Sequence, residues 1–289
     1  MEYHNPDSFE EAVEIATRSQ GITRFLAGGT DVLVQLRSDI VIPDTLINIK
    51  GIDGVKQIVR TETGGWRIGI AVSGAEMTEH AELGRDWPGL VEATDLIGST
   101  QIQGRCTMVG NLCNGSPAAD AVPAMVAAGV TVSVTGPDGT REVPVEDIPT
   151  GPGRTSLARG EMISAVHVPP RGNRGGDAYL RFIPRTEMDI AVVGCGINLR
   201  LDGDSIAEAR VALGAVAPTV RLVPEAAAAI VGTTLDDAAL AALAAAASAA
   251  CDPIDDKRGT VKFRTHVAGV LAQRAARIAY DRAKAGERG

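Results

Sequence analysis

Two adjacent glycines, Gly28 and Gly29, lie in the sequence AGGTD, between a short apolar segment and the start of a helical pattern. Paired glycines let a backbone turn sharply, and the free amides at the start of a helix attract anions. The backbone from Ala27 to Asp31 could therefore hold a pyrophosphate. The same residues could instead form only a tight turn, with Thr30 or Asp31 as the N-cap of the helix. The turn matches neither the dinucleotide fingerprint G-x-G-x-x-G nor the phosphate-binding loop that ends in G-K-[ST].

A second candidate stretch, TMVGNLCNGSPAAD, covers residues 107–120. The pattern predicts a short apolar strand that ends at Gly110, then a loop of small polar residues, and then a helix that Asp120 caps. The loop offers neutral hydrogen-bonding groups, and the Asp120 carboxylate could accept a hydrogen bond from a ribose or ribityl hydroxyl. The polar candidates are Asn111, Asn114, Ser116 and Asp120. A capped loop without any ligand is the alternative.

The cysteines and histidines indicate no metal site. The four cysteines, Cys106, Cys113, Cys195 and Cys251, include no C-x-x-C pair, so the chain cannot supply its own iron–sulfur site or four-cysteine zinc site. The four histidines are far apart in the sequence and form no H-E-x-x-H pattern. Cys106 and Cys113 flank the loop of the second stretch and have no basic neighbour except Arg105, so we expect them to be unreactive. No residues form a recognisable catalytic dyad.

Composition excludes several functional classes. The chain has 289 residues, with 28 Lys and Arg against 36 Asp and Glu, and a formal net charge of -8. It has no basic tail or basic run, so the charge pattern of a general nucleic-acid-binding protein is missing. No apolar stretch approaches the roughly 20 residues of a membrane span. The first residues are acidic and polar where a signal peptide is basic and then apolar, so we expect a cytoplasmic protein.

The elements that position the two stretches begin with alternating helices and strands. Ser8 and Glu11 form a capping-box pattern before an amphipathic helix. Strands are expected at residues 22–26 and 45–49, with a short helix at 32–37 between them. This alternation predicts a small parallel α/β layer.

From about residue 55 the pattern is that of an antiparallel α+β unit. Residues 66–72 alternate as a half-buried strand does, and two short helices follow. VTVSV and REVPV flank a turn at Pro137–Gly139 and predict a hairpin. Residues 150–176 contain the densest Gly, Pro and Arg, and are the best candidate for a boundary or a mobile loop.

The last part of the chain predicts a hairpin and then helices. Asp202 and Gly203 are expected to close a hairpin whose two arms both carry apolar residues. The Ala-rich residues 235–250 have strong helix propensity, and apolar residues between Val267 and Ile278 line one face of a final helix.

With both candidate stretches in one chain, the sequence resembles the FAD-binding medium subunits of the molybdenum hydroxylases, which include carbon monoxide dehydrogenase and xanthine dehydrogenase. AGGTD is similar to the first FAD signature of that family, and TMVGN with NGSPAAD is similar to the second. The resemblance continues through LARGEMI, RTEMDIAVV and LGAVAPTVRLVPEA, and it ends in PIDDKRGTVKFR. It therefore covers nearly the whole chain.

The resemblance implies an α+β fold with FAD as the cofactor. A two-part FAD-binding domain is expected, with an α/β subdomain at residues 1–55 and a larger antiparallel α+β subdomain at residues 56–172. A C-terminal flavoprotein domain of a sheet and helices would occupy residues 173–289.

The resemblance also assigns residues to FAD binding. The backbone of residues 27–31 would hold the pyrophosphate, and the second stretch would line the adenosine and ribityl side. Arg181 stands where relatives often carry a lysine near the flavin ring, while Val109 and Phe263 replace a usual glycine and a common tyrosine. The assigned residues are Ala27, Gly28, Gly29, Thr30, Asp31, Thr107, Gly110, Asn111, Asn114, Ser116, Asp120, Met162, Ile163, Arg181 and Asp189.

Two of the later residues have a purely structural alternative. Tyr179 could stack on the flavin or only pack in the core. Asp189 could form only an ion pair with Arg185.

In function, the resemblance implies an electron-transferring oxidoreductase subunit without catalytic side chains of its own. A large molybdopterin subunit would hydroxylate the substrate, and a small subunit with two [2Fe-2S] clusters would pass the electrons to FAD. From FAD they would leave to an external acceptor, and the complex would be a dimer of heterotrimers. The alternatives are a scaffold subunit without flavin and a stand-alone flavin or nicotinamide oxidoreductase.

Overall fold

The computed structural model describes residues 1–185 and 188–286. Its first part is the parallel α/β layer that the sequence predicts, with the strand order β1-β3-β2. The elements are β1 (Glu2–His4), α1 (Phe9–Arg18), β2 (Thr23–Leu26), α2 (Val32–Arg37), β3 (Thr45–Asn48) and the 3-10 turn η1 (Ile49–Gly51).

Helix α1 begins at only half of the predicted capping box. The Ser8 hydroxyl accepts a hydrogen bond from the Glu11 amide at 3.1 Å, whereas the Glu11 carboxylate accepts from the Asp7 amide instead of that of Ser8. A complete capping box lies elsewhere, at Ser73 and Glu76 before α3.

The second part is built on a five-stranded antiparallel sheet with the order β4-β5-β10-β6-β7. Its strands are β4 (Ile58–Arg60), β5 (Trp66–Ile68), β6 (Thr131–Gly136), β7 (Gly139–Pro144) and β10 (Met162–Val168), and β6 with β7 forms the predicted hairpin. The helices are α3 (Gly74–Glu79), α4 (Ala81–Asp86), α5 (Pro88–Asp95), α6 (Thr100–Gln103), α7 (Met108–Cys113) and α8 (Ala121–Ala128). The 3-10 turn η2 (Val145–Asp147) and the small pair β8 (Pro149–Gly151) and β9 (Arg154–Thr155) complete this part.

One prediction for this part holds only in part, and another is wrong. Residues 150–176 are not a loop throughout, because they contain β10, the middle strand of the sheet, but they do include the connection from this sheet to the next strand, at residues 169–174. The strand expected to end at Gly110 is the helix α7, whose N-cap Thr107 accepts a hydrogen bond from the Gly110 amide at 2.9 Å. Its apolar residues fit a one-sided helix as well as a strand, an ambiguity that is usual for short apolar runs.

The C-terminal part is a four-stranded antiparallel sheet in chain order, followed by helices. The strands are β11 (Gly175–Phe182), β12 (Val193–Asp202), β13 (Ser205–Gly214) and β14 (Arg221–Leu222); the helices are α9 (Pro224–Ala228), α10 (Asp237–Ala249) and α11 (Val261–Ala285). The hairpin turn is one residue later than predicted, because Asp202 pairs with Ser205 and leaves Gly203 and Asp204 as the turn.

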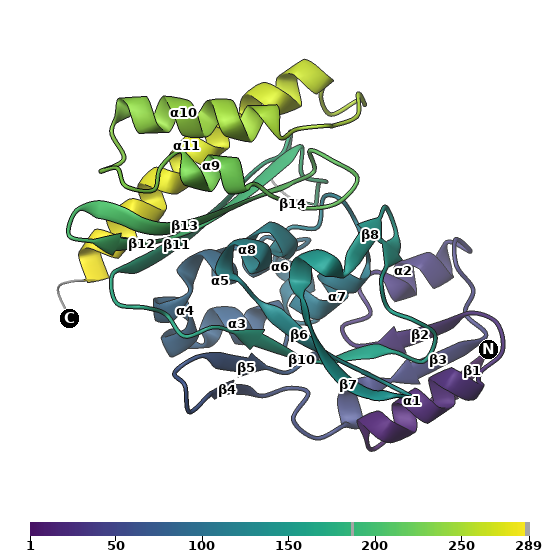
Figure 1. Ribbon diagram of the computed structural model, residues 1–289. Coiled ribbons are helices and arrows are strands. Elements are labelled where there is room, and N and C mark those ends of the chain that lie inside the picture. The colour runs from purple at the N-terminus through teal and green to yellow at the C-terminus, as the bar shows by residue number, and fades with distance from the viewer. Residues whose placement is uncertain (186–187, 287–289) are drawn as a thin grey trace.

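This C-terminal sheet is covered on both faces (Figure 1). A Cβ at Gly176 would lie 2.0 Å from the Ala279 carbonyl oxygen of α11, and one at Gly196 would lie 2.5 Å from the Pro123 carbonyl oxygen of α8. The two glycines thus let α11 and α8 approach the sheet from opposite sides. Tyr179 and Ala212 belong to the same apolar core as α8 and the middle sheet, so that core crosses from the second part into the third. Within the described residues, no helix combines the length and apolar character that a membrane span requires.

Candidate functional site

A cavity of about 580 Å³ lies between the first part of the chain and the second, antiparallel part, which we call the middle part. Its walls come from β2 and the glycine turn after it, from the start of α7, and from residues 153–163. The cavity collects these residues of the predicted set: Ala27, Gly28, Gly29, Thr30, Asp31, Thr107, Gly110, Asn111, Asn114, Met162 and Ile163. The two stretches identified in the sequence therefore meet at one site.

The glycine turn is specified by close contacts and by backbone conformation. Gly29 has a φ of +80°, which side chains rarely allow. A Cβ at Gly28 would lie 1.9 Å from the carbonyl oxygen of Arg105. Gly28 therefore lets this turn pack directly against the backbone that leads into α7, so the glycine joins the two walls rather than enlarging the cavity.

The backbone amides of this turn are free donors. Among the described residues, the amides of Gly28, Gly29, Thr30 and Asp31 donate no hydrogen bond to another residue. Backbone donors in folded proteins are normally paired, either within the protein or with water or a ligand. Four successive free donors on a cavity wall suit an anion with several oxygen acceptors.

Asp31 connects the two stretches. It occupies the N-cap position of α2, but its side chain makes no capping hydrogen bond. The Asn114 amide group instead donates to the Asp31 carboxylate at 3.3 Å. Thr30 also makes no such bond. The turn thus places Asp31 at the N-cap position, as one alternative predicted, but neither side chain caps the helix.

Other polar residues of the second stretch hold α7 and α8 together. The Asn111 side-chain oxygen accepts a hydrogen bond from the Ala121 amide at 3.0 Å, across the two helices. Ser116 accepts from the Ala118 amide at 3.2 Å and does not line the cavity.

Asp120 and Arg181 lie behind the cavity wall as a buried ion pair. Arg181 Nη1 is 2.9 Å from Asp120 Oδ1, and the same nitrogen donates to the Leu96 carbonyl oxygen at 2.8 Å. Burial raises the pKa of Asp120 to about 6, although Arg181 acts in the opposite direction. The prediction that the Asp120 side chain caps α8 is wrong, because Asp120 makes no capping hydrogen bond and the Ala121 amide donates to Asn111 instead. Neither residue lines the cavity.

Tyr179 lies beside this pair and is buried in the apolar core that contains α8 and the middle sheet. Its hydroxyl has no hydrogen-bond partner among the described residues, and burial, with Asp120 nearby, raises the pKa of this hydroxyl well above its usual value. The ring does not line the cavity, which favours the packing role over stacking on a flavin.

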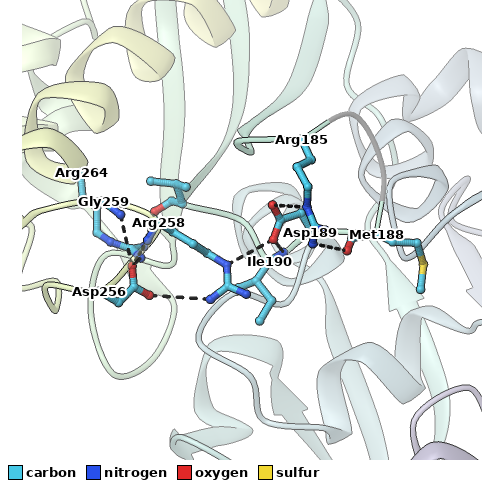
Figure 2. A network of polar contacts seen from close by, with 9 residues as sticks. Arg185, Met188, Asp189, Ile190, Asp256, Arg258, Gly259 and Arg264 are labelled. Carbon is cyan, nitrogen blue, oxygen red and sulfur yellow. Dashed lines mark hydrogen bonds and ion pairs between the residues drawn. The ribbon is translucent and has the colours of Figure 1, made fainter.

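Asp189 belongs to a separate ion-pair network at the C-terminal part (Figure 2). It accepts hydrogen bonds from Arg185 and from Arg258, both at 3.2 Å, and the bond from Arg185 contributes most to lowering the pKa of Asp189 to about 2. Asp256 extends the network to the buried Arg264. The ion pair of Asp189 with Arg185 is thus present, and Asp189 does not line the cavity, while its assignment to FAD binding stays a prediction.

Several cavity residues were missed in the sequence analysis. Arg24 and Phe25 belong to the predicted strand that leads into the glycine turn, and this position could have identified them as cavity residues. Arg159 lies in the Gly- and Arg-rich stretch that was interpreted as a loop. Ile70 and Ile97 carry no local signal, because only the packing of the chain brings them to the cavity. The missed residues include Arg24, Phe25, Gln35, Ile70, Ile97, Thr155 and Arg159.

Cys106 and Cys113 both line the cavity, and their lack of reactivity stays a prediction. Cys106 is 1% exposed, and burial raises the pKa of its thiol to about 11. The thiolate that reacts or binds metals is therefore scarce at neutral pH.

Comparison with known proteins assigns the two halves of the chain to the same kind of enzyme. Residues 1–171 match the family described as FAD binding domain in molybdopterin dehydrogenase. Residues 178–279 match the family described as CO dehydrogenase flavoprotein C-terminal domain.

Individual relatives agree with this assignment. The carbon monoxide dehydrogenase medium chain of Afipia carboxidovorans is 32% identical over 289 residues, with 98% of both chains covered. The xanthine dehydrogenase FAD-binding subunit of Escherichia coli O157:H7 is 33% identical over 218 residues, covering 75% of this chain and 74% of the relative.

Solved structures give the same result. A structure of reconstituted CO dehydrogenase from Oligotropha carboxidovorans superposes with a TM-score of 0.93 at 31% identity, with 98% of both chains covered. The cavity, the free amides on its wall and these matches lead to one conclusion: the chain belongs to the family of FAD-binding medium subunits of the carbon monoxide and xanthine dehydrogenase type, which are oxidoreductases of the molybdenum hydroxylase group.

Proposed function

We propose that the cavity holds FAD with its diphosphate on the amides of Gly28 to Asp31. The row of free amides carries this proposal, because a diphosphate supplies the acceptors that these donors lack within the described chain. The rest of the cofactor would lie along the walls formed by residues 107–114 and 153–163. The residues proposed to line it are Ala27, Gly28, Gly29, Thr30, Asp31, Thr107, Gly110, Asn111, Asn114, Met162 and Ile163.

The charges on the cavity wall also suit a diphosphate. Arg24 and Arg159 both line the cavity, and their side chains donate to the carbonyl oxygens of Thr23 and Ser19. Among the described residues, neither is paired with a carboxylate. Glu161 on the same wall is neutralised by Arg141, whose Nη2 lies 2.9 Å from it. Asp31 is the other carboxylate residue on the described wall, so the two arginines still leave a net positive charge for an anion.

The four remaining residues of the predicted set have indirect roles in this proposal. Ser116 shapes the loop through its bond to the Ala118 amide. Asp120 holds Arg181, which donates to the Leu96 carbonyl oxygen next to the cavity residue Ile97. Asp189 accepts a hydrogen bond from Arg258, in the segment before α11. Bound FAD supplies the redox chemistry, and the protein supplies binding, orientation and polarity.

We further propose that electrons reach this FAD from the two [2Fe-2S] clusters of a small partner subunit and leave to an external acceptor. A large molybdopterin partner would hydroxylate the substrate, and the assembly would be a cytoplasmic dimer of heterotrimers. The printed names of the relatives, medium chain and FAD-binding subunit, support a place among other chains. The scattered cysteines of this chain offer no iron–sulfur ligand set, which is consistent with an outside electron donor.

The chain is also proposed to divide at residues 1–55, 56–172 and 173–289. Each of the three larger sheets lies wholly within one of these ranges, which supports the division.

The FAD site is tested by binding. The purified chain, stripped of flavin, should bind FAD more tightly than FMN and much more tightly than riboflavin, because only FAD carries the full diphosphate. Arg24→Ala and Arg159→Ala should weaken FAD binding and leave riboflavin binding unchanged, while Arg18→Ala, an exposed arginine paired with Glu14, should change neither. A protein that stays colourless with FAD would contradict the proposal.

The electron route is tested by purification from cells. Co-purification of two further chains with iron and molybdenum would support the heterotrimer. A single chain that completes a reaction without iron–sulfur partners would favour the stand-alone oxidoreductase instead.

A further inference from the structure

A second cleft, of about 460 Å³, lies between the middle part and the C-terminal part and shares no residue with the first cavity. Five arginines from four regions of the chain line this arginine cleft: Arg60 at the end of β4, Arg85 on α4, Arg171 and Arg174 between β10 and β11, and Arg282 on α11. Asp86 is the one carboxylate residue that lines it within the described chain. The concentration is local, because the whole chain carries a net charge of -8.

Two of the guanidinium groups are held in place by partners outside the cleft. Arg171 lies 2.6 Å from the buried Asp177 and stacks over the Trp87 ring at 4.1 Å. Arg282 pairs with Glu92 and donates to the Asp177 carbonyl oxygen at 2.8 Å. A guanidinium has five N–H donors, so one fixed by such contacts still presents donors to the cleft. Fixed arginines lose less conformational entropy when they bind an anion.

The other arginines differ in how they are held. Arg60 is 2.6 Å from Asp86 and lies over the Trp66 ring at 4.6 Å. Arg85 is exposed and donates to no other described residue, so its charge is uncompensated. Arg60, Arg171 and Arg282 each have a carboxylate partner, so Arg85 supplies the positive charge on which anion binding most depends.

The backbone at the cleft wall is unusual at Arg174. This residue has a φ of +59°, a conformation that non-glycine residues seldom adopt. The turn is held by the Gly175 amide, which donates to the Gly172 carbonyl oxygen at 3.1 Å, and by the Leu201 amide, which donates to the Arg174 carbonyl oxygen at 3.0 Å. Such conformations persist where the surrounding structure enforces them, and they are frequent at ligand sites.

We propose that the arginine cleft binds a small phosphate-bearing anion, at a site separate from the FAD cavity. Arginine forks match the oxygens of phosphate groups with paired hydrogen bonds. The wall includes main chain around Gly172 and Gly175 and offers little apolar side-chain surface, so the phosphate groups rather than an attached ring system would be recognised. Free diphosphate and the phosphate tail of a nucleotide are the two sources of this chemistry.

The test uses the full chain loaded with FAD, so that the first cavity is filled, and measures binding of inorganic phosphate, diphosphate, ADP and adenosine by calorimetry. Diphosphate should bind saturably, with an affinity that falls as salt is added. Arg85→Glu should weaken diphosphate binding by roughly tenfold or more, since it reverses a charge that has no structural partner. Arg277→Ala is the matched control, because Arg277 is an exposed arginine on the same helix as Arg282.

The ligand series separates the two sources. ADP that binds more tightly than diphosphate would indicate a nucleotide, and equal affinities would indicate the free anion; either result supports the proposal. Adenosine that binds as well as ADP would overturn it, and so would diphosphate binding that is absent or is unchanged by Arg85→Glu. A short acidic peptide that binds more tightly than diphosphate would also overturn it, in favour of a protein partner.

Unchanged FAD absorbance in Arg85→Glu would show that the first cavity is intact. Failure of the anion proposal therefore stays distinguishable from failure of FAD binding.

Discussion

At Asp120, burial and an ion-pair partner act on one carboxylate in opposite directions. Arg181 favours the charged form and the surrounding core favours the neutral form, and burial is the larger effect. The sequence indicated a side chain that binds a ribose or ribityl hydroxyl, and that role stays a prediction. The structure pairs this side chain with Arg181 and leaves it outside the cavity lining. A motif can therefore identify a functional neighbourhood without assigning each residue its role.

The pH dependence of stability should reveal the raised pKa of Asp120. Its pKa is about 6 in the folded chain and near 3.8 when unfolded, so between these values the folded state holds a proton that the unfolded state has lost. Raising the pH through this window should therefore lower the free energy of unfolding of the wild type relative to Asp120→Asn, by about 3 kcal/mol in total. Urea unfolding at a series of pH values measures this difference.

Asp189 provides the control for that experiment, because its pKa is lowered to about 2. Its contribution to stability should be present above about pH 4 and should be lost as the pH falls through 2. A wild-type curve that does not differ in shape from that of Asp120→Asn would contradict the burial effect.

Gly28→Ala tests the contact between the two cavity walls. The new Cβ would meet the Arg105 carbonyl oxygen, so the glycine turn must move away from the start of α7. We expect a loss of about 1–3 kcal/mol of stability, measured by urea unfolding, together with weaker FAD retention. Gly104→Ala is the matched control, since a Cβ there has no heavy atom within 4 Å; equal effects of the two changes would refute the contact.

Among the elements, α7 is positioned by a single cap. The Thr107 hydroxyl satisfies the Gly110 amide at the start of this six-residue helix, which lines the cavity. A helix this short is unstable by itself and depends on its cap and its packing.

Thr107→Ala should therefore cost about 1 kcal/mol of stability and raise the FAD dissociation constant roughly fivefold. Asp236→Ala removes the cap of α10, far along the chain, where the Asp236 carboxylate accepts from the Ala239 amide at 2.8 Å. It should cost similar stability without a change in FAD binding. Flavin fluorescence titration measures the second quantity, and a loss of FAD affinity in both variants would assign the effect to global stability.

Long periodic elements were predictable from the sequence. The hairpin of β6 and β7, the parallel first layer and the two long C-terminal helices follow from alternation, turn residues and helix propensity, which act over a few neighbours. α7 and β10 were not predictable in this way. The short apolar run of α7 suits a helix or a strand equally well, and β10 acquires its place only by pairing with strands far away in the chain. The glycine turn was recognisable because its signal lies in a few adjacent residues. Ile70 and Ile97 could not be recognised as cavity residues, because only the packing of the chain brings them there.

At the scale of the whole molecule, the FAD-binding part and the C-terminal part share one apolar core. α8 is buried along its entire length, between the middle part and the C-terminal sheet, and Pro123 fits against Gly196 and Gly214. The domain boundaries that the sequence suggests therefore do not separate independent cores.

A fragment of residues 1–172 should for this reason be unstable alone. It would expose the face of α8 that contacts β12 and β13, and it would leave Arg171 without Asp177. We expect aggregation or a broad elution in gel filtration and no retained FAD, compared with the full chain. A monomeric fragment with a cooperative unfolding transition would contradict this expectation.

The pairing of β10 with β5 on one side and β6 on the other has a consequence for biosynthesis. β5 ends at Ile68, whereas β10 ends at Val168, about 100 residues later. At a translation rate of roughly 5–20 residues per second, the nascent chain waits roughly 5–20 seconds on the ribosome with an open strand edge. Open edges invite pairing with other chains, so chaperone protection during synthesis should improve the yield of folded protein.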